Sequence, residues 1–307
     1  MEVRPLHPIF AAELVGADLT GEIHPELVAL VEDAMAEYGV LAIRDAKIDD
    51  EQHKKFSRAF GPLENPSRAK DAPDRPQGKR VFTPAIFYAG NIDHNDEIVP
   101  YGADAAKLAK GAERFHTDSS FHTMPTKWSL LHGVETPPPE VGGDTWFVDA
   151  RAAYDDLPLA TKQRIEGLSG IHDFWIGRRR AGLEGEITTE MRRIIPFPTV
   201  THSLVRTMPN GRKTLYVGGH CVGIEGIDDA EGIELVEQLY AHATQEKYIY
   251  RHQWRRWDIV IWDNRCTMHA ATPLLSNAYR RDMRRTTINE SGPETTAYQW
   301  MGLGEAA

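Results

Sequence analysis

Short β-prone runs separated by turns recur along most of this 307-residue chain and constrain its fold more than any other feature. Runs of apolar and β-branched residues predict strands at 8–16, 40–43, 81–89, 128–134, 146–148, 204–206, 214–217, 248–251, 258–262 and 284–288. Helical spacing of apolar residues is confined to 25–38, 49–60, 151–167 and 229–243. Many short strands with few helices predict a mixed α/β, mainly β, fold: a double-stranded β-helix of the jelly-roll or cupin-like type with flanking helices.

Local signals fix the ends of several of these elements. Pro25 suits the first turn of a helix that Gly39 would end. Asp49 and Gln52 have the spacing of a capping box at the start of the next helix. The segment Pro209-Asn210-Gly211 predicts a hairpin between two strands.

The composition, 41% hydrophobic and 26% charged, is that of an ordinary globular protein. We expect a single domain over residues 1–307. Three long segments, 63–80, 91–113 and 175–200, are polar and aperiodic, and loops of that length in a compact domain are often lids over a functional site. These segments are the lid candidates, and we expect the arginine triplet 178–180 within the last one to lie on a solvated surface.

Charge and cysteine content exclude several classes of function. The net charge is −10 and no long basic run occurs, so binding to nucleic acid is not expected. Cys221 and Cys266 lack the spacing of a zinc ribbon or a disulfide framework. The first residues lack the apolar core of a signal peptide, and no stretch is long and apolar enough to span a membrane. We therefore expect a cytoplasmic protein.

Residues 114–121 carry the strongest chemical signal, an imidazole and a carboxylate separated by one residue. If this stretch is a strand, His116 and Asp118 point to the same face. Two such ligands are part of the 2-His-1-carboxylate site of non-haem Fe(II) oxygenases. Two similar pairs, His94 with Asp96 and His24 with Glu26, fall in a polar loop and at a helix start, where metal binding is not expected.

A third ligand and an anion site are suggested by the C-terminal part of the chain. His269 lies at the end of an apolar strand. Beyond it the sequence holds several arginines, whose planar guanidinium groups bind carboxylates in a bidentate manner. Arg281 and Arg285 are four residues apart and would share one face of an ideal strand. Two arginines lining one cavity imply two anions to neutralise.

At this point the sequence resembles the 2-oxoglutarate-dependent dioxygenases grouped around taurine dioxygenase and 2,4-dichlorophenoxyacetate dioxygenase. The resemblance covers nearly the whole chain and is carried by motifs spread along it. They are Gly16-Ala17-Asp18-Leu19, Phe60-Gly61-Pro62-Leu63-Glu64, His116-Thr117-Asp118-Ser119-Ser120-Phe121, Gly142-Gly143-Asp144-Thr145, His172-Asp173-Phe174, Gly211-Arg212-Lys213, Trp262-Asp263-Asn264-Arg265 and the arginine-rich end.

The resemblance implies a role for individual residues. His116, Asp118 and His269 match the ligands of Fe(II). Arg281 and Thr145 match the residues that hold the distal carboxylate of the cosubstrate 2-oxoglutarate, and Arg285 matches the arginine that meets the anionic group of the substrate. Phe174 matches an aromatic residue of the substrate pocket and Trp262 a tryptophan near the metal, although plain core packing also accounts for both. The implied reaction consumes O2 and 2-oxoglutarate, releases succinate and CO2, and hydroxylates a substrate carbon.

The substrate class is narrowed by departures from the taurine pattern. Asn65 to Ser67 and Ala112 stand where the taurine enzyme has its amine-binding histidine and asparagine. Segments 118–121, 149–155 and 262–266 resemble the phenoxyacetate branch more closely, so we expect an aryloxyalkanoate carboxylate whose ether is cleaved after hydroxylation. Alternatives are an alkyl sulfonate or a natural aromatic carboxylate as substrate, a cupin-like binding protein, or a zinc hydrolase. Relatives that associate make a homo-oligomer the expected assembly.

Overall fold

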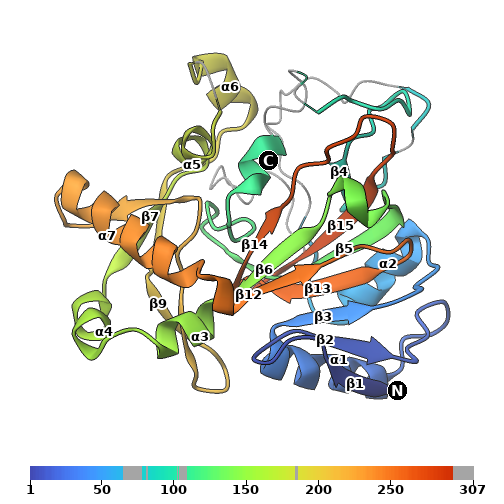
Figure 1. Ribbon diagram of the computed structural model, residues 1–307, viewed down its shortest axis with the longest axis horizontal. Helices are drawn as coiled ribbons and strands as arrows, with labels where there is room; N and C mark the ends of the chain where they lie inside the picture. Colours follow the sequence, from blue (N-terminus) through green and yellow to red (C-terminus); the bar gives the residue numbers. More distant parts are fainter. Residues whose placement is uncertain (65–77, 81, 102, 104–108, 184–185, 293–307) are drawn as a thin grey trace.

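The structure, a computed structural model, describes residues 1–64, 78–80, 82–101, 103, 109–183 and 186–292 (Figure 1). Its larger sheet has seven strands in the order β1-β2-β3-β13-β5-β15-β4. In that order the strands span Glu2–Pro5, Ala12–Val15, Val40–Ile43, Ile259–Asp263, Thr126–Glu135, Asp282–Asn289 and Phe87–Gly90. Neighbouring strands of this sheet are antiparallel except β2 and β3, which are parallel.

Three smaller sheets complete the β structure. The first has the order β12-β6-β14, and its strands span Ile249–His252, Thr145–Asp149 and Thr267–Ala271. The second has the order β11-β7-β8, with strands Cys221–Ile224, Ser169–His172 and Val200–Ser203. The third is the hairpin of β9 (Val205–Thr207) and β10 (Lys213–Leu215), which confirms the hairpin predicted across Asn210.

Seven α-helices lie around these sheets in the part of the chain that the structure describes. They are α1 (Pro25–Tyr38), α2 (Asp50–Arg58), α3 (Ala150–Asp155), α4 (Leu159–Ile165), α5 (Phe174–Arg180), α6 (Thr189–Ile194) and α7 (Asp229–Ala243). Short 3₁₀ turns are η2 (Ala109–Glu113), η3 (Pro139–Val141) and η4 (Glu246–Tyr248). Helix α1 starts at Pro25 and ends at Gly39 in the left-handed conformation, as predicted. The capping box of Asp49 and Gln52 is also present.

Strand alternation divides the core into layers. In β13, Ile259 and Ile261 face the helices α1 and α2, whereas Val260 and Trp262 face the sheet β12-β6-β14. The centre of the seven-stranded sheet is therefore buried on both faces, whereas its edge strands β1 and β4 are largely exposed. The smaller sheet is covered on its far side by α3 and α7, because Val148 of β6 packs in the cluster that contains their apolar residues. Figure 1 shows these helices on the opposite side of the molecule from α1 and α2. The prediction of a double sheet with flanking helices is confirmed.

Three local predictions need correction. The helix expected at 151–167 is two helices, α3 and α4, because Pro158 interrupts it. The strand expected at 81–89 is shorter and lies at Phe87–Gly90. The aperiodic segment 175–200 contains α5 and α6, which begin at side-chain caps supplied by Asp173 and Thr188.

The lid candidates fall partly outside the described residues. Of segment 63–80 the structure describes 63–64 and 78–80, and of segment 91–113 it describes 91–101, 103 and 109–113. That these segments move as lids, and that the chain is one domain, stay predictions. In the described part of the chain, no helix is long and apolar enough to cross a membrane.

Candidate metal centre

His116 and His269 are joined by their own backbones. Each donates its amide N–H to the carbonyl of the other, with both N···O distances 2.9 Å. His269 lies in β14, and His116 forms an isolated bridge with it. The pairing brings the two imidazole rings to 4.2 Å between centroids. Our expectation that His269 ends the strand 258–262 was wrong, since a turn at 264–266 separates that strand from β14.

Asp118 reaches the same place from a turn. The condition that residues 114–121 form a strand is not met, because Asp118 opens a turn in which Ser119 has a φ of 51°. The amide of Asp118 donates to Oδ1 of Asn264 at 3.1 Å, which fixes the backbone where the chain leaves the bridge. The two side chains therefore converge through a bridge and a turn rather than through strand alternation.

The ligand atoms of His116, Asp118 and His269 all lie within 4.8 Å of one another, and all three residues are buried. No other group of this kind occurs in the part of the chain that the structure describes. The Nε2 atoms of His116 and His269 lie 3.9 Å and 3.8 Å from the oxygens of Asp118. Burial lowers the pKa of His116 to about 4 and that of His269 to about 3. Both imidazoles are therefore neutral near pH 7, as metal binding requires.

Two neighbours orient these ligands. Nδ1 of His116 lies 2.9 Å from the Arg114 carbonyl, so this nitrogen carries the proton and Nε2 offers its lone pair. Ser129 donates its hydroxyl to Oδ2 of Asp118 at 2.8 Å. Burial opposes ionisation of Asp118, but the Arg285 guanidinium, which donates to Oδ1 at 2.5 Å, outweighs it. The pKa of the carboxyl is thus held well below its usual range.

Asn264 connects these groups to the sheets. Its Oδ1 accepts from the indole Nε1 of Trp262 at 3.0 Å, and its Nδ2 donates to Ser129 Oγ at 3.0 Å. The Trp262 ring lies 4.6 Å from the His269 ring between centroids. The tryptophan expected near the metal is therefore beside a ligand histidine, where it packs in the core and holds Asn264.

His116 and Asp118 line a cavity of about 790 Å³, which is large enough for a small organic ligand, and His269 lies behind them in the cluster. The predicted residues Phe174, Arg281 and Arg285 also line this cavity. Arg281 precedes β15 by one residue and Arg285 lies within it. The structure thus brings together both arginines that were expected to share a face.

Arg281 lines the cavity, whereas Thr145 is not among its lining residues. Nε of Arg281 donates to the Gly143 carbonyl at 3.2 Å. Burial lowers the pKa of Arg281 to about 10, with Asp144 acting in the opposite sense, so the guanidinium stays charged near pH 7. Thr145 is buried at the start of β6 and is paired with Ala271 of β14. Its hydroxyl accepts from Trp254 Nε1 at 3.0 Å, an arrangement in which it can still donate its own proton.

Sequence reasoning missed Arg178, because the triplet 178–180 suggested a solvated surface. Arg179 is exposed as expected, but Arg180 donates to the carbonyls of Cys221 and Val222, and Arg178 lines the cavity. A signal for Arg178 was present: it follows Phe174 by four residues, and that spacing places both on one face of a helix. The guanidinium carbon lies 4.9 Å from the centre of the Phe174 ring.

A cluster of aromatic side chains forms part of the cavity wall. Phe121, Phe174 and Phe197 pack within 5.1 Å of one another between ring centroids. The His220 ring is stacked on Phe174, with 6.1 Å between centroids. Glu64 also lines the cavity, and burial raises the pKa of this carboxyl to about 7. The cavity therefore offers an apolar ring-binding surface beside several charged groups.

The two alternative pairs do not form metal sites with the described residues. His94 and Asp96 lie in a turn, where Asp96 pairs with Arg280 at 2.6 Å. His24 is the exposed residue before α1. That neither pair binds a metal stays a prediction.

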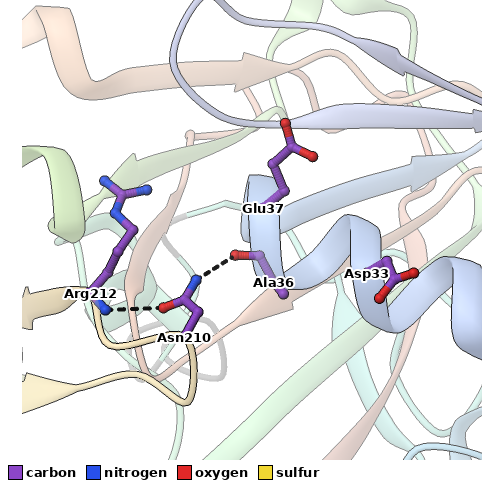
Figure 2. A pocket seen from close by; sticks show the side chains of 5 residues that line it. All are labelled: Asp33, Ala36, Glu37, Asn210 and Arg212. Atoms are coloured by element: carbon purple, nitrogen blue, oxygen red, sulfur yellow. Dashed lines mark hydrogen bonds between the residues drawn. The ribbon is translucent and has the colours of Figure 1, made fainter.

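A second, shallow pocket lies on the surface between α1 and the β9–β10 hairpin (Figure 2). Asn210 donates from Nδ2 to the Ala36 carbonyl at 3.3 Å and accepts from the Arg212 amide at 3.1 Å. The first bond attaches the hairpin to the end of α1, and the second lies within the hairpin. The pocket shares no lining residue with the cavity at the metal centre, and its contacts have a structural role.

Comparison with known proteins decides which family this site belongs to. Residues 2–287 match the family described as taurine catabolism dioxygenase TauD, TfdA family. The chain belongs to this family. It is 35% identical to the α-ketoglutarate-dependent 2,4-dichlorophenoxyacetate dioxygenase of Cupriavidus pinatubonensis, over 94% of this chain and 97% of that protein. It is 33% identical to the (S)-phenoxypropionate/α-ketoglutarate dioxygenase of Sphingobium herbicidovorans, over 89% of each chain.

Comparison with solved structures supports the same family assignment. The crystal structure of AAD-2 in complex with Mn(II) and N-oxalylglycine is similar to this chain, with a TM-score of 0.81 and 33% identity over 96% of this chain and 100% of that one. The predicted membership of the TauD/TfdA family, the jelly-roll fold and the assignment as a dioxygenase are confirmed. As a member of this family, the protein uses Fe(II), 2-oxoglutarate and O2.

Proposed function

We propose that this protein hydroxylates an aryloxyalkanoate carboxylate on the carbon beside its ether oxygen. One atom of O2 enters the substrate, the other enters succinate, and 2-oxoglutarate loses CO2. The hydroxylated product is a hemiacetal, which collapses to a phenol and a small oxo acid. The observation that carries the proposal is the buried His-Asp-His cluster, two members of which line a cavity that also has guanidinium groups and aromatic side chains.

We assign the metal to His116, Asp118 and His269. Two neutral imidazoles and one ionised carboxylate form the facial donor set of non-haem Fe(II), and the cavity leaves room for further ligands. When bound there, the iron together with 2-oxoglutarate activates O2 for the hydroxylation. Ser129 and Arg114 hold the carboxylate and one imidazole in place for this role.

We assign the distal carboxylate of 2-oxoglutarate to Arg281 and Thr145. A charged guanidinium and a hydroxyl that can donate its proton suit a carboxylate in a partly buried site. The Gly143 carbonyl orients the guanidinium from behind. These contacts bind and position the cosubstrate.

We assign the substrate to Arg285 and Phe174. Nε of Arg285 is buried and has no hydrogen-bond partner among the described residues, so its N–H can donate to an anion. Phe174 contributes its ring to the aromatic wall, which can exclude water and pack against an aryl group. Trp262 supports the site through Asn264 and His269.

The first test is anaerobic addition of Fe(II) and 2-oxoglutarate to the purified protein. We expect a visible charge-transfer absorption band in the wild type and its absence in His116→Ala. A His24→Ala variant, which removes an exposed histidine that does not line the cavity, should retain the band. A wild-type protein without this band that is active with zinc would contradict the assignment.

The second test is a panel of substrates assayed by succinate release in air. We expect phenoxyacetate and phenoxypropionate to stimulate succinate release and to yield phenol. The chain is also 29% identical to the alkylsulfatase of Acinetobacter baylyi over 94% of its length, so alkyl sulfates and sulfonates belong in the panel. If only alkyl sulfates or sulfonates are turned over, the assignment of an aryloxyalkanoate substrate is wrong.

We further propose a homo-oligomer in the cytoplasm. Both cysteines are buried free thiols, which supports a reducing compartment, and the family resemblance supports association of subunits. Light scattering after size exclusion tests the assembly, because a mass of 34.5 kDa would indicate a monomer.

A further inference from the structure

Arg178 brings a third guanidinium group to the cavity. It lies in α5, whereas Arg281 and Arg285 come from β15 and the residue before it. All three side chains line the same space as His116 and Asp118. Figure 1 shows α5 at the end of the molecule away from α1 and α2, so this arginine reaches the centre from a separate part of the fold.

The position of the Arg178 side chain is fixed by its neighbours. A Cβ atom on Gly111 of η2 would lie 2.0 Å from Nη1 of Arg178 and 2.8 Å from its Cζ. Residue 111 therefore has to be glycine for the guanidinium to occupy this place. On its other side the guanidinium packs over the Phe174 ring. Asp173, which caps α5 by accepting from the Ile176 amide at 2.8 Å, sets the start of the helix.

The electrostatics of this position favour an anion. Burial lowers the pKa of Arg178 to about 10, Asp118 acts in the opposite sense, and Arg285 adds to the lowering. The guanidinium is charged near pH 7, and the like charge of Arg285 in the same cavity acts against it. Because two such charges repel each other, an anion bound near both is stabilised by both.

We infer that Arg178 is a substrate-binding residue that, together with Arg285, holds the carboxylate of an aryloxyalkanoate while Phe174 packs against its aryl group. This inference rests on the proposed function for the identity of the substrate. It assigns Arg281 to the cosubstrate alone and divides the recognition of the substrate anion between α5 and β15. A compound in which a neutral group replaces the carboxylate should therefore bind much more weakly than the acid.

The test compares phenoxyacetate with its neutral analogue phenoxyacetamide. Binding of each is measured by anaerobic calorimetry to the intact protein loaded with Fe(II) and 2-oxoglutarate. We expect the wild type to bind the acid more tightly. In Arg178→Gln the affinity for the acid should fall about 10-fold to 100-fold, as for loss of a charge-assisted hydrogen bond, while the affinity for the amide changes little.

Two further variants separate binding from packing. Arg179→Gln removes the exposed neighbouring charge and should bind both compounds as the wild type does. Gly111→Ala keeps every charge but displaces the Arg178 guanidinium. It should therefore lower the affinity for the acid more than the affinity for the amide. Equal weakening of acid and amide in Arg178→Gln would overturn the inference in favour of packing against Phe174. Unchanged affinities for both acid and amide in Arg178→Gln would overturn it in favour of Arg285 acting alone.

Failure of the proposed function is a different result. Succinate release by the wild-type protein from 2-oxoglutarate in air reports on the dioxygenase chemistry and does not involve Arg178 variants. Absence of that release contradicts the proposed function, while the binding comparison still decides the role of Arg178. A wild-type protein that binds acid and amide equally would overturn the inference itself.

Discussion

Single hydrogen bonds at the metal centre determine how its carboxylate is presented. The two oxygens of Asp118 have different partners, Arg285 at Oδ1 and Ser129 at Oδ2. Because Ser129 also accepts from Asn264, its hydroxyl proton is directed to the carboxylate. The serine therefore links the ligand to β5 and to the turn after β13, and restricts its rotation.

We predict that Ser129→Ala lowers the affinity for Fe(II) by about 10-fold to 100-fold, as for other residues that orient metal ligands. The reason is that Asp118 loses the donor at Oδ2 and Asn264 loses an acceptor. Fe(II) titration followed by the charge-transfer band measures the change. Ser119→Ala is the matched control, since Ser119 donates to Glu64 and not to a ligand. Equal losses in the two variants would contradict a specific role for Ser129.

The residues of the site differ in how well the sequence alone predicts their role. His116 and Asp118 are recognisable as an imidazole and a carboxylate one residue apart, yet the geometry that unites them is a bridge and a turn. His269 is far away in the chain, so its convergence with them depends on strand pairing that only the family resemblance implied. Arg178 was missed because its charged neighbours masked its spacing from Phe174, a spacing that helix geometry makes informative.

Secondary-structure elements differ in how strongly local sequence specifies them. Helix α1 was predicted closely because proline begins it, glycine ends it and its apolar residues recur at helical spacing. Strands β3 and β13 were predicted because each is an apolar run buried on both faces. The helices α5 and α6 were missed because each has only one or two turns and lies in a polar, glycine-containing segment. Their capping residues Asp173 and Thr188 were the readable signal.

We predict that Gly39→Ala destabilises the protein by about 1–2 kcal/mol, since an L-residue is strained in the left-handed conformation. The φ of Gly39 is 70°, and an added Cβ would lie 2.9 Å from Nη2 of Arg151. Urea unfolding measures the difference. Gly21→Ala is the control, because an added methyl group there meets nothing within 4 Å. Equal stability of the two variants would contradict the stated cause.

At the scale of the whole molecule, buried neutral histidines couple stability to pH. Burial lowers the pKa of His53, His122 and His172 to about 3 each. In the unfolded chain these side chains bind protons below pH 6.5, whereas in the folded protein they stay neutral until about pH 3. The unfolded state therefore binds more protons in this window, and folding stability falls as the pH is lowered.

We predict that the free energy of unfolding is insensitive to these histidines above pH 6.5. As the pH falls from 6.5 towards 3, each should cost about 1.4 kcal/mol per pH unit. Urea unfolding of the metal-free protein at a series of pH values measures the slope. His53→Gln keeps a polar group near Thr286. It should reduce the dependence of the unfolding free energy on pH by the contribution of one histidine. A slope unaltered by this variant would show that His53 is not a buried neutral group.

The reciprocal backbone bonds between His116 and His269 have a consequence for how such an enzyme changes over time. They make the spacing of the two imidazoles a property of the main chain, which substitutions in surrounding side chains leave intact. The walls that face a substrate come largely from other segments, among them α5 and the residues around Phe121 and Phe197. Variation in those segments can therefore alter which compound is accepted while the oxidising centre is inherited unchanged.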